Sequence, residues 1–424
     1  MKILMFFGEV PIKYGGKKAG GAAKVAWYLS KELAKYHDVY LYPLHDFSKM
    51  ANVENVNIIN RNKKKIIFTH IPNIKTFKKY YDYFRYYGFN KSLSLRFALS
   101  NSIIEKFMQK YIKKINPDII HIHEISAERL FAINLSFKNK VPLILTSHSV
   151  KSDIYEYKNT SIPEKLENRK IFESDIYNKI ISKNNGYITT VSSKIKEKII
   201  NYYNIPKNKI KVILNGISND FIKTNETKKY ELRKKHNIPI DKKVFLTVGT
   251  LSKRKNQILV LKSLLEINNN IRSNLLYILV GEGNEKNNLK NFVKKNNLEK
   301  NVLFVGNKFS DELIEYYWLS DYFVLTSLSE AMPLVFFEAL ASGLPIITIK
   351  TLEGVSDIYN ENCFVLSNDF NPKSIKNAIL NSLNRSWDSS YIINYSKNFT
   401  WDTIAEKYHN LYKELLRIKW KKYQ

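Results

Sequence analysis

Two glutamates, Glu330 and Glu338, lie on either side of a predicted strand-to-helix turn, with seven residues between them. Apolar runs at 321–326 and 346–349 are typical of strands buried on both faces of a parallel sheet. The segment between them predicts one helix that begins near Leu334, after a proline, and ends at a Ser-Gly pair. Both carboxylates would face the crevice where open parallel sheets bind ligands, close to a helix start that suits a phosphate. Sugar or ribose hydroxyls are the groups that two such acids would grip.

A purely structural interpretation stays open at this point, since Glu330 could cap the helix and Glu338 could complement its macrodipole. The order Glu-Ala-Met-Pro-Leu at 330–334, then Glu-Ala-Leu-Ala-Ser-Gly-Leu-Pro at 338–345, resembles the nucleotide-sugar site of retaining glycosyltransferases of the GT-B fold, family four. The resemblance implies that Glu338 holds the ribose hydroxyls of the donor. It also implies which residues face the donor sugar and diphosphate: Glu330, Ala331, Met332, Pro333 and Leu334.

A cationic turn precedes this motif in the sequence. A predicted strand ends at Gly249, and Arg254 and Lys255 follow before a predicted helix at 257–265, which places positive charge over the crevice. In so lysine-rich a chain, a solvated turn is the alternative. The resemblance assigns Lys255 to the donor diphosphate. Many family members carry an arginine directly after the glycine, where this chain has Thr250, and Arg254 would supply that charge instead.

The resemblance places three further segments near the donor. Residues after Gly306, up to Phe309, would border the nucleotide base, and the turn at 353–357 would lie near the diphosphate. The glycine-rich loop that includes Gly20 and Gly21 lets backbone amides approach an anion and would lie across the cleft from the donor phosphates.

Histidines end two predicted strands of the amino-terminal half. His148 closes the strand at 143–148, and the resemblance places it near the reacting sugar and the acceptor. His121 and His123 share one face of the strand at 118–123. We expect no metal there, because the chain offers no cysteine partner at ligand spacing and no His-Glu-x-x-His helix.

Composition limits the alternatives. The 424 residues suffice for two domains, and no apolar run approaches the roughly 18 residues that span a bilayer. The start is too short for a signal peptide, and the single cysteine, Cys363, suits a reducing compartment, so we expect a cytoplasmic protein. The net charge of +29 is spread along the chain, and without a nucleic-acid motif we expect no specific nucleic-acid partner.

The segment at 61–114 concentrates this charge, with fourteen Lys or Arg against Asp82 and Glu105. Eight aromatic residues lie within it between Phe77 and Phe89. If helical, it would present aromatics and cations together, as helices on anionic lipid do. The alternative, slightly favoured, is an insertion that packs its aromatics against its own domain.

The alternating strands and helices predict an α/β protein, and the resemblance implies two facing Rossmann-like domains of the GT-B fold, each with a parallel sheet. Residues 1–217 would form the acceptor-side domain and residues 218–395 the nucleotide-sugar domain. A helix within 396–424 would pack back on the first domain. Polar residues at 218–241 predict a connector with one short helix.

The resemblance implies a retaining transferase that moves a sugar from a nucleotide-sugar donor to a glycan or lipid-linked acceptor, in cell-surface polysaccharide or glycolipid synthesis. The catalytic set would be His148, Glu330, Arg254 and Lys255, with cations stabilising the leaving diphosphate. We expect no cofactor or metal, because no Asp-x-Asp pair occurs in the sequence. The expected location is the cytoplasm, with a peripheral position on the inner face of the membrane as an option. Two alternatives are a sugar-nucleotide 2-epimerase of the same fold and a non-catalytic protein on a transferase scaffold that binds a polyanion or a membrane.

Overall fold

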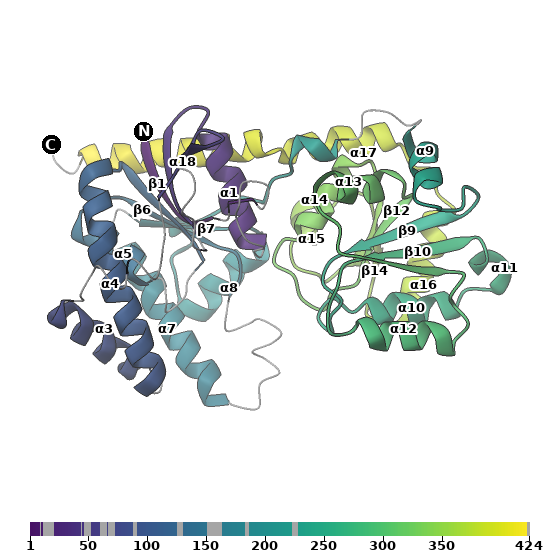
Figure 1. Cartoon of the computed structure of the whole chain (residues 1–424), viewed down its shortest axis with the longest axis horizontal. Coiled ribbons are helices and arrows are strands. Elements are labelled where there is room, and N and C mark those ends of the chain that lie inside the picture. Colours follow the sequence, from purple (N-terminus) through teal and green to yellow (C-terminus); the bar gives the residue numbers. More distant parts are fainter. Residues whose placement is uncertain are drawn as a thin grey trace. The chain divides into compact units, whose positions relative to one another are not determined.

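The computed structural model describes residues 1–8, 10–11, 21–43, 45, 52–59, 66, 73–87, 91–124, 130–150, 163–182, 186–222 and 228–421. The chain divides into two compact units (Figure 1). The first comprises Met1–Asn215 with Trp401–Gln424, and the second comprises Gly216–Thr400. Each unit is built around one sheet, as the alternating strand and helix pattern predicts.

The first unit has an eight-stranded sheet in the order β3-β4-β2-β1-β5-β6-β7-β8, parallel except for the β3–β4 pair. Most of its strands are short runs of apolar residues buried on both faces, which is the composition expected of a parallel sheet. The strands are β1 (Lys2–Gly8), β2 (Asp38–Pro43), β3 (Asn52–Val53), β4 (Val56–Ile58), β5 (Ile119–His123), β6 (Leu143–Ser147), β7 (Gly186–Thr190) and β8 (Ile210–Val212).

Helices cover both faces of this sheet. One face carries α1 (Gly21–Leu33) and α18 (Trp401–Lys421), which pack on each other (Figure 1). The other face carries α4 (Lys91–Ile115), α5 (Leu130–Lys138) and α7 (Pro163–Ser182), with α3 (Ile74–Tyr86) packed on α4. Among the described helices of this unit, α8 (Ser193–Tyr203) lies between β7 and β8 in the sequence. The expected return of the carboxyl-terminal helix to the first domain is confirmed.

The second unit has a six-stranded, wholly parallel sheet in the order β11-β10-β9-β12-β13-β14. Its strands are β9 (Lys243–Val248), β10 (Leu275–Val280), β11 (Val302–Gly306), β12 (Tyr322–Leu325), β13 (Ile346–Ile349) and β14 (Phe364–Ser367). One face is covered by α10 (Gln257–Leu265), α12 (Lys286–Lys295) and α16 (Pro372–Leu383), and the other by α13 (Ser310–Trp318), α14 (Leu334–Ala341) and α17 (Ser389–Ser396) (Figure 1). Two four-residue helices, α11 (Asn269–Arg272) and α15 (Val355–Ile358), and α9 (Lys228–Lys235) complete the unit.

The boundaries between the units differ by a few residues from the expected ones. The amide of Ile217 donates to the carbonyl of Phe399 over 2.9 Å. The Phe399 ring lies 5.3 Å from that of Phe337 in α14. Residues 216–217 and 396–400 therefore belong to the second unit, where a backbone bridge and aromatic packing hold them.

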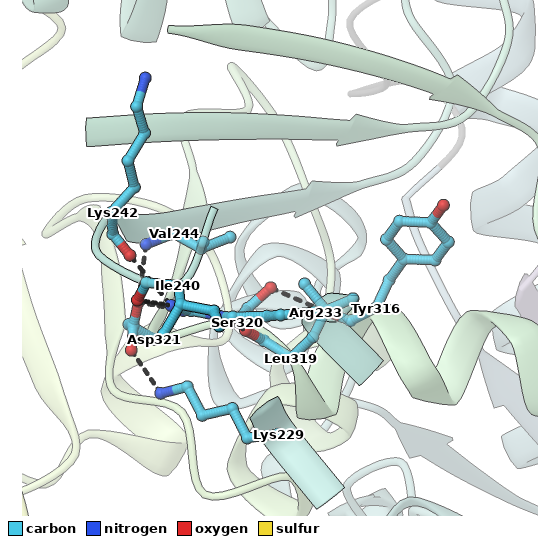
Figure 2. A network of polar contacts seen from close by, with 9 residues as sticks. All are labelled: Lys229, Arg233, Ile240, Lys242, Val244, Tyr316, Leu319, Ser320 and Asp321. Carbon is cyan, nitrogen blue, oxygen red and sulfur yellow. Dashed lines mark hydrogen bonds and ion pairs between the residues drawn. The ribbon is translucent and has the colours of Figure 1, made fainter. Parts of the chain in front are cut away.

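The predicted polar connector contains a short helix, α9, which is anchored by its one buried side chain, Arg233. Its Arg233 is 3% exposed and donates to the carbonyls of Leu319 and Ile240, each over 2.9 Å, and to the Asp321 carboxylate over 2.7 Å. Lys229 forms a second ion pair with Asp321 (Figure 2). A polar sequence gave no sign of this anchor, because two of its partners, Leu319 and Asp321, lie far away in the chain.

The aromatic segment at 74–87 divides between two faces of α3. Tyr80 and Phe84 are buried, and the Tyr80 hydroxyl donates to Glu105 of α4 over 2.5 Å. Ile74 and Tyr86, by contrast, are 83% and 79% exposed. Packing against its own domain, the favoured interpretation, is right for the inner face and leaves the outer face open to solvent. Among the described helices, none is long and apolar enough to cross a membrane.

Candidate functional site

Two loops at the carboxyl ends of β9 and β12 are joined by hydrogen bonds. The amide of Leu328 donates to the carbonyl of Arg254 over 2.8 Å. The Thr326 hydroxyl donates to the carbonyl of Asn256 over 2.9 Å, and the Asn256 amide group donates back to the carbonyl of Thr326 over 3.3 Å. These bonds hold the cationic turn against the loop that carries Glu330.

Two of the predicted cations, Lys255 and Arg254, contact the carboxylate of Glu330, the predicted acid of the neighbouring loop. Lys255 Nζ lies 2.5 Å from Glu330 Oε1, and the Arg254 guanidinium donates to the same oxygen over 3.1 Å. The Lys255 and Glu330 side chains are only 12% and 11% exposed. Burial acts to raise the pKa of Glu330, but the charges of Lys255 and Arg254 outweigh it and hold that pKa below its ordinary value. Glu330 is therefore ionised at neutral pH and accompanied by two cations.

Glycines let the loops approach closely enough to place Lys255. Gly249 ends β9 with φ +151°, and a Cβ built on it would lie 3.4 Å from Cε of Lys255. Gly281 follows β10 with φ +146°, and a Cβ there would lie 1.9 Å from the carbonyl oxygen of Gly249. A side chain at Gly281 would therefore push apart the turn on which Lys255 stands.

Helix α14 begins at Leu334 and carries the second predicted acid. Its N-cap is Pro333, with no side-chain cap hydrogen bond, so Glu330 does not cap this helix. Glu338 accepts a hydrogen bond from the hydroxyl of Tyr317 over 2.5 Å. Sequence reasoning missed Tyr317, because it is one of two adjacent tyrosines in α13 and no spacing rule selects it as the partner of Glu338.

The loop between the two acids packs against a turn that begins α15. Gly354 has φ +83°, and a Cβ built on it would lie 2.9 Å from the carbonyl oxygen of Ala331 and 3.0 Å from Cε of Met332. Met332 is itself buried. The turn at 353–357, expected near the diphosphate, thus contacts the loop that connects Glu330 to α14.

The other predicted contact residues have simpler surroundings. Phe309 precedes α13 with an exposed side chain. Gly21 is the first residue of α1, and a Cβ on it would meet no atom within 4 Å. Gly20 lies outside the described residues. Arg254, Lys255, Glu330, Glu338, Gly249 and Phe309 belong to the second unit, whereas Gly21 and His148 belong to the first.

His148 stands at the end of a chain of stacked imidazole rings. Its Nε2 lies 2.9 Å from Nδ1 of His123, and the His123 ring stacks on that of His121 at 4.4 Å. His121 contacts the hydroxyls of Tyr412 and Thr146, each at 2.7 Å. Burial, with a smaller contribution from His148, lowers the pKa of His121 to about 3, so this ring is neutral at physiological pH. These contacts between the histidines and their partners connect β5 and β6 to α18 and orient His148.

Family models match both halves of the chain. Residues 19–221 match "Glycosyltransferase Family 4", and residues 228–399 match "Glycosyl transferases group 1". The chain is a glycosyltransferase of the GT-B fold. This enzyme is 26% identical over 308 residues to the uncharacterized glycosyltransferase MJ1607 of Methanocaldococcus jannaschii, a match that covers 70% of the chain and 75% of the relative.

A second relative of this glycosyltransferase is the UDP-Gal:alpha-D-GlcNAc-diphosphoundecaprenol alpha-1,3-galactosyltransferase of Escherichia coli. The two are 29% identical over 301 residues, which cover 69% of this chain and 72% of the relative. Among solved structures, Anabaena Alr3699/HepE in complex with UDP and glucose superposes with a TM-score of 0.71 at 17% identity, over 97% of this chain and 99% of that one. This likeness confirms the GT-B fold.

Proposed function

We propose that this glycosyltransferase takes a sugar from a nucleotide-sugar donor, with retention of configuration, and transfers it to a glycan or lipid-linked acceptor in cell-surface glycan synthesis. The observation that carries the proposal is the pair of cations held at the carboxyl edge of the second sheet, where Lys255 and Arg254 converge on a buried carboxylate. The Escherichia coli relative, named for a UDP-galactose donor and a diphosphoundecaprenol-linked acceptor, supports a donor and acceptor of these classes.

In this proposal the donor diphosphate lies between the cationic turn and the start of α14. Negative charge grows on the diphosphate as the bond to the sugar breaks, and Arg254, Lys255 and the first amides of α14 stabilise it. Because Glu330 fixes both cations before the donor arrives, little reorganisation is needed during the reaction. Glu338 would hold the ribose hydroxyls, and Glu330 would also orient the donor sugar.

His148 would orient and stabilise the reacting groups on the acceptor side. Neither His148 nor Glu330 needs to act as a covalent nucleophile, because the proposed route delivers the acceptor to the face that the diphosphate leaves. The residues assigned to the diphosphate carry positive charge themselves, so we propose that transfer proceeds without a bound metal. Retention would be tested by nuclear magnetic resonance of the product's anomeric proton.

The test of the donor class is a comparison of UDP, GDP and ADP by thermal shift, followed by calorimetry of the best ligand. We expect one of them to bind, and Lys255→Ala and Glu338→Ala each to weaken its binding. Unchanged binding in both variants would remove the site assignment. Release of nucleoside diphosphate that requires an acceptor would support transfer, whereas a nucleotide sugar converted without any acceptor would support an epimerase instead.

We also propose that the outer face of α3 contacts an anionic membrane, where a lipid-linked acceptor would reside. The support is the combination of exposed Ile74 and Tyr86 with exposed cations on the same helix, namely Lys75, Lys78, Lys79 and Arg85. The inner aromatics anchor the helix, so its outer face is available as a rigid amphipathic surface.

Sedimentation with vesicles of phosphatidylglycerol and phosphatidylcholine in equal amounts tests this contact. Each lysine near such a surface contributes about 1 kcal/mol, so the double change Lys78→Glu/Lys79→Glu should weaken binding by at least about tenfold. The matched control is Lys294→Glu/Lys295→Glu on α12, which makes the same change in net charge at exposed positions of the second unit. Equal losses in both variants would mean that only net charge matters and would refute a specific face.

A further inference from the structure

The Tyr317 side chain, which contacts the proposed ribose ligand Glu338, is held rigidly by its neighbours. It is completely buried in α13. The centroid of its ring lies 5.9 Å from that of the stacked Phe323 ring of β12 and 5.5 Å from that of Phe221, with which it makes an edge-to-face contact. Phe221 is itself held, since its carbonyl accepts hydrogen bonds from the Trp318 indole and the Ser342 hydroxyl, each over 3.2 Å. The Tyr317 hydroxyl therefore occupies a fixed position in the unit.

This hydroxyl donates to Oε2 of Glu338 over 2.5 Å, which is short for a neutral donor and typical of a charge-assisted hydrogen bond. Burial, together with the charge of Glu338 and this bond, raises the pKa of Tyr317 well above its ordinary value. Tyr317 thus stays a neutral donor at any pH at which the enzyme works. Glu338 is half-buried, and a fixed internal donor holds one of its carboxylate oxygens.

We propose that Tyr317 is a positioning residue for the donor nucleotide: it fixes the rotamer and the carboxylate plane of Glu338 so that this acid can accept both ribose hydroxyls. The inference rests on the proposed role of Glu338. A glutamate on a helix has three side-chain torsions, and a partner that holds one oxygen removes most of their freedom before the ligand binds. The affinity gained in this way depends on the ribose hydroxyls and on nothing else in the ligand.

The variant that tests the proposal is Tyr317→Phe, which removes one oxygen and keeps the ring that packs between Phe221 and Phe323. The matched control is Tyr277→Phe. Tyr277 is also a fully buried tyrosine of the second unit, and its hydroxyl contacts Thr247 over 2.9 Å rather than any predicted site residue. The control therefore reports what the loss of a buried hydroxyl does by itself.

Each protein is titrated by calorimetry with UDP and with 2′,3′-dideoxyuridine diphosphate, or with the GDP or ADP pair if that base binds better. A hydrogen bond to a charged group is strong enough that the wild type should prefer the ribonucleotide by about tenfold or more. Tyr317→Phe should reduce this preference to about threefold or less, through weaker ribonucleotide binding alone, while Tyr277→Phe keeps it. With a sugar donor, KM should rise in Tyr317→Phe with kcat within about twofold, since the bond acts on donor binding.

The proposal is overturned if Tyr317→Phe keeps the wild-type preference, or if it weakens both ligands equally, which would indicate a general loss of structure. A wild type that binds both ligands alike overturns the role of Glu338 itself, and with it the role of Tyr317. Failure of the Tyr317 role and failure of the Glu338 role can therefore be distinguished, because only the latter shows in the wild-type protein.

Discussion

The substitution Lys255→Met separates the structural and the ligand-binding roles of the cationic turn. It keeps the aliphatic stem above Gly249 and removes the ammonium group that lies 2.5 Å from Glu330. Breaking a buried ion pair by removing one partner costs about 3–5 kcal/mol, because the other charge stays buried. Arg254 remains on the same Glu330 oxygen at 3.1 Å and its side chain is 29% exposed, so water and guanidinium compensate in part.

We therefore expect Lys255→Met to destabilise the protein by about 1–3 kcal/mol. For a unit of this size, each kcal/mol lowers the thermal midpoint by roughly 2–4 °C. The double variant Lys255→Met/Glu330→Gln removes both charges while keeping the shape of the Glu330 side chain. It should recover most of the lost stability, because the buried carboxylate charge is gone and Arg254, whose side chain is 29% exposed, is partly solvated.

Ligand affinity should fall in the single variant and, unlike stability, should not recover in the double variant. If Lys255 binds the diphosphate, its loss removes a charge-assisted hydrogen bond, and the Kd for the nucleoside diphosphate should rise about ten- to a hundredfold. The double variant should not recover this affinity, although it recovers stability. Calorimetry and thermal unfolding of the same three proteins measure both quantities. A double variant that binds as tightly as the wild type would refute the reasoning, because Lys255 would then serve only to neutralise Glu330.

Three further predictions concern stability and backbone. Burial opposes the ionisation of Asp321, but Lys229 and Arg233 hold its pKa below the ordinary value, so its stabilisation is complete above about pH 4 and is lost as the pH falls through the folded pKa. Asp321→Asn should therefore cost about 3 kcal/mol at pH 7, and the difference from wild type in urea unfolding should shrink below pH 4. Burial lowers the pKa of His121 to about 3, so below about pH 6.5 the unfolded chain binds a proton that folded His121 does not. This residue alone contributes a fall in stability of at most about 1.4 kcal/mol per pH unit, to which His37 and His409 add, since burial lowers their pKa values as well. His121→Asn should remove its own contribution to the slope, and a variant with the wild-type slope would contradict the assignment. Gly354→Ala should destabilise the protein by about 1–3 kcal/mol, because φ is +83° and the new Cβ would meet the Ala331 carbonyl oxygen at 2.9 Å; an unchanged thermal midpoint would contradict this.

Features encoded locally could be predicted from the sequence. The bounds of α14 follow from a proline before an apolar helix and a glycine after it, and the buried strands on either side follow from short apolar runs. The meeting of Arg254, Lys255 and Glu330 also follows, since the carboxyl ends of neighbouring parallel strands share one edge of the sheet.

Features that depend on distant partners could not be predicted. The Tyr317–Glu338 bond joins two helices through a hydroxyl that the sequence does not distinguish from that of the adjacent Tyr316. The burial of Arg233 in a polar helix depends on carbonyls of two other segments, the loop at 240–242 and the end of α13. Likewise, composition shows that the segment at 74–87 is aromatic and basic, but only packing on α4 and α7 decides which side chains face inward.

The central claim is that the second unit holds the donor's diphosphate at Lys255 and Arg254 and its ribose at Glu338. A crystal structure of the enzyme with the nucleoside diphosphate that stabilises it best tests this most directly. The account predicts density for the phosphates against the two cations and for the ribose hydroxyls on the Glu338 carboxylate. Density for the nucleotide elsewhere, with Lys255 still paired only to Glu330, would contradict it.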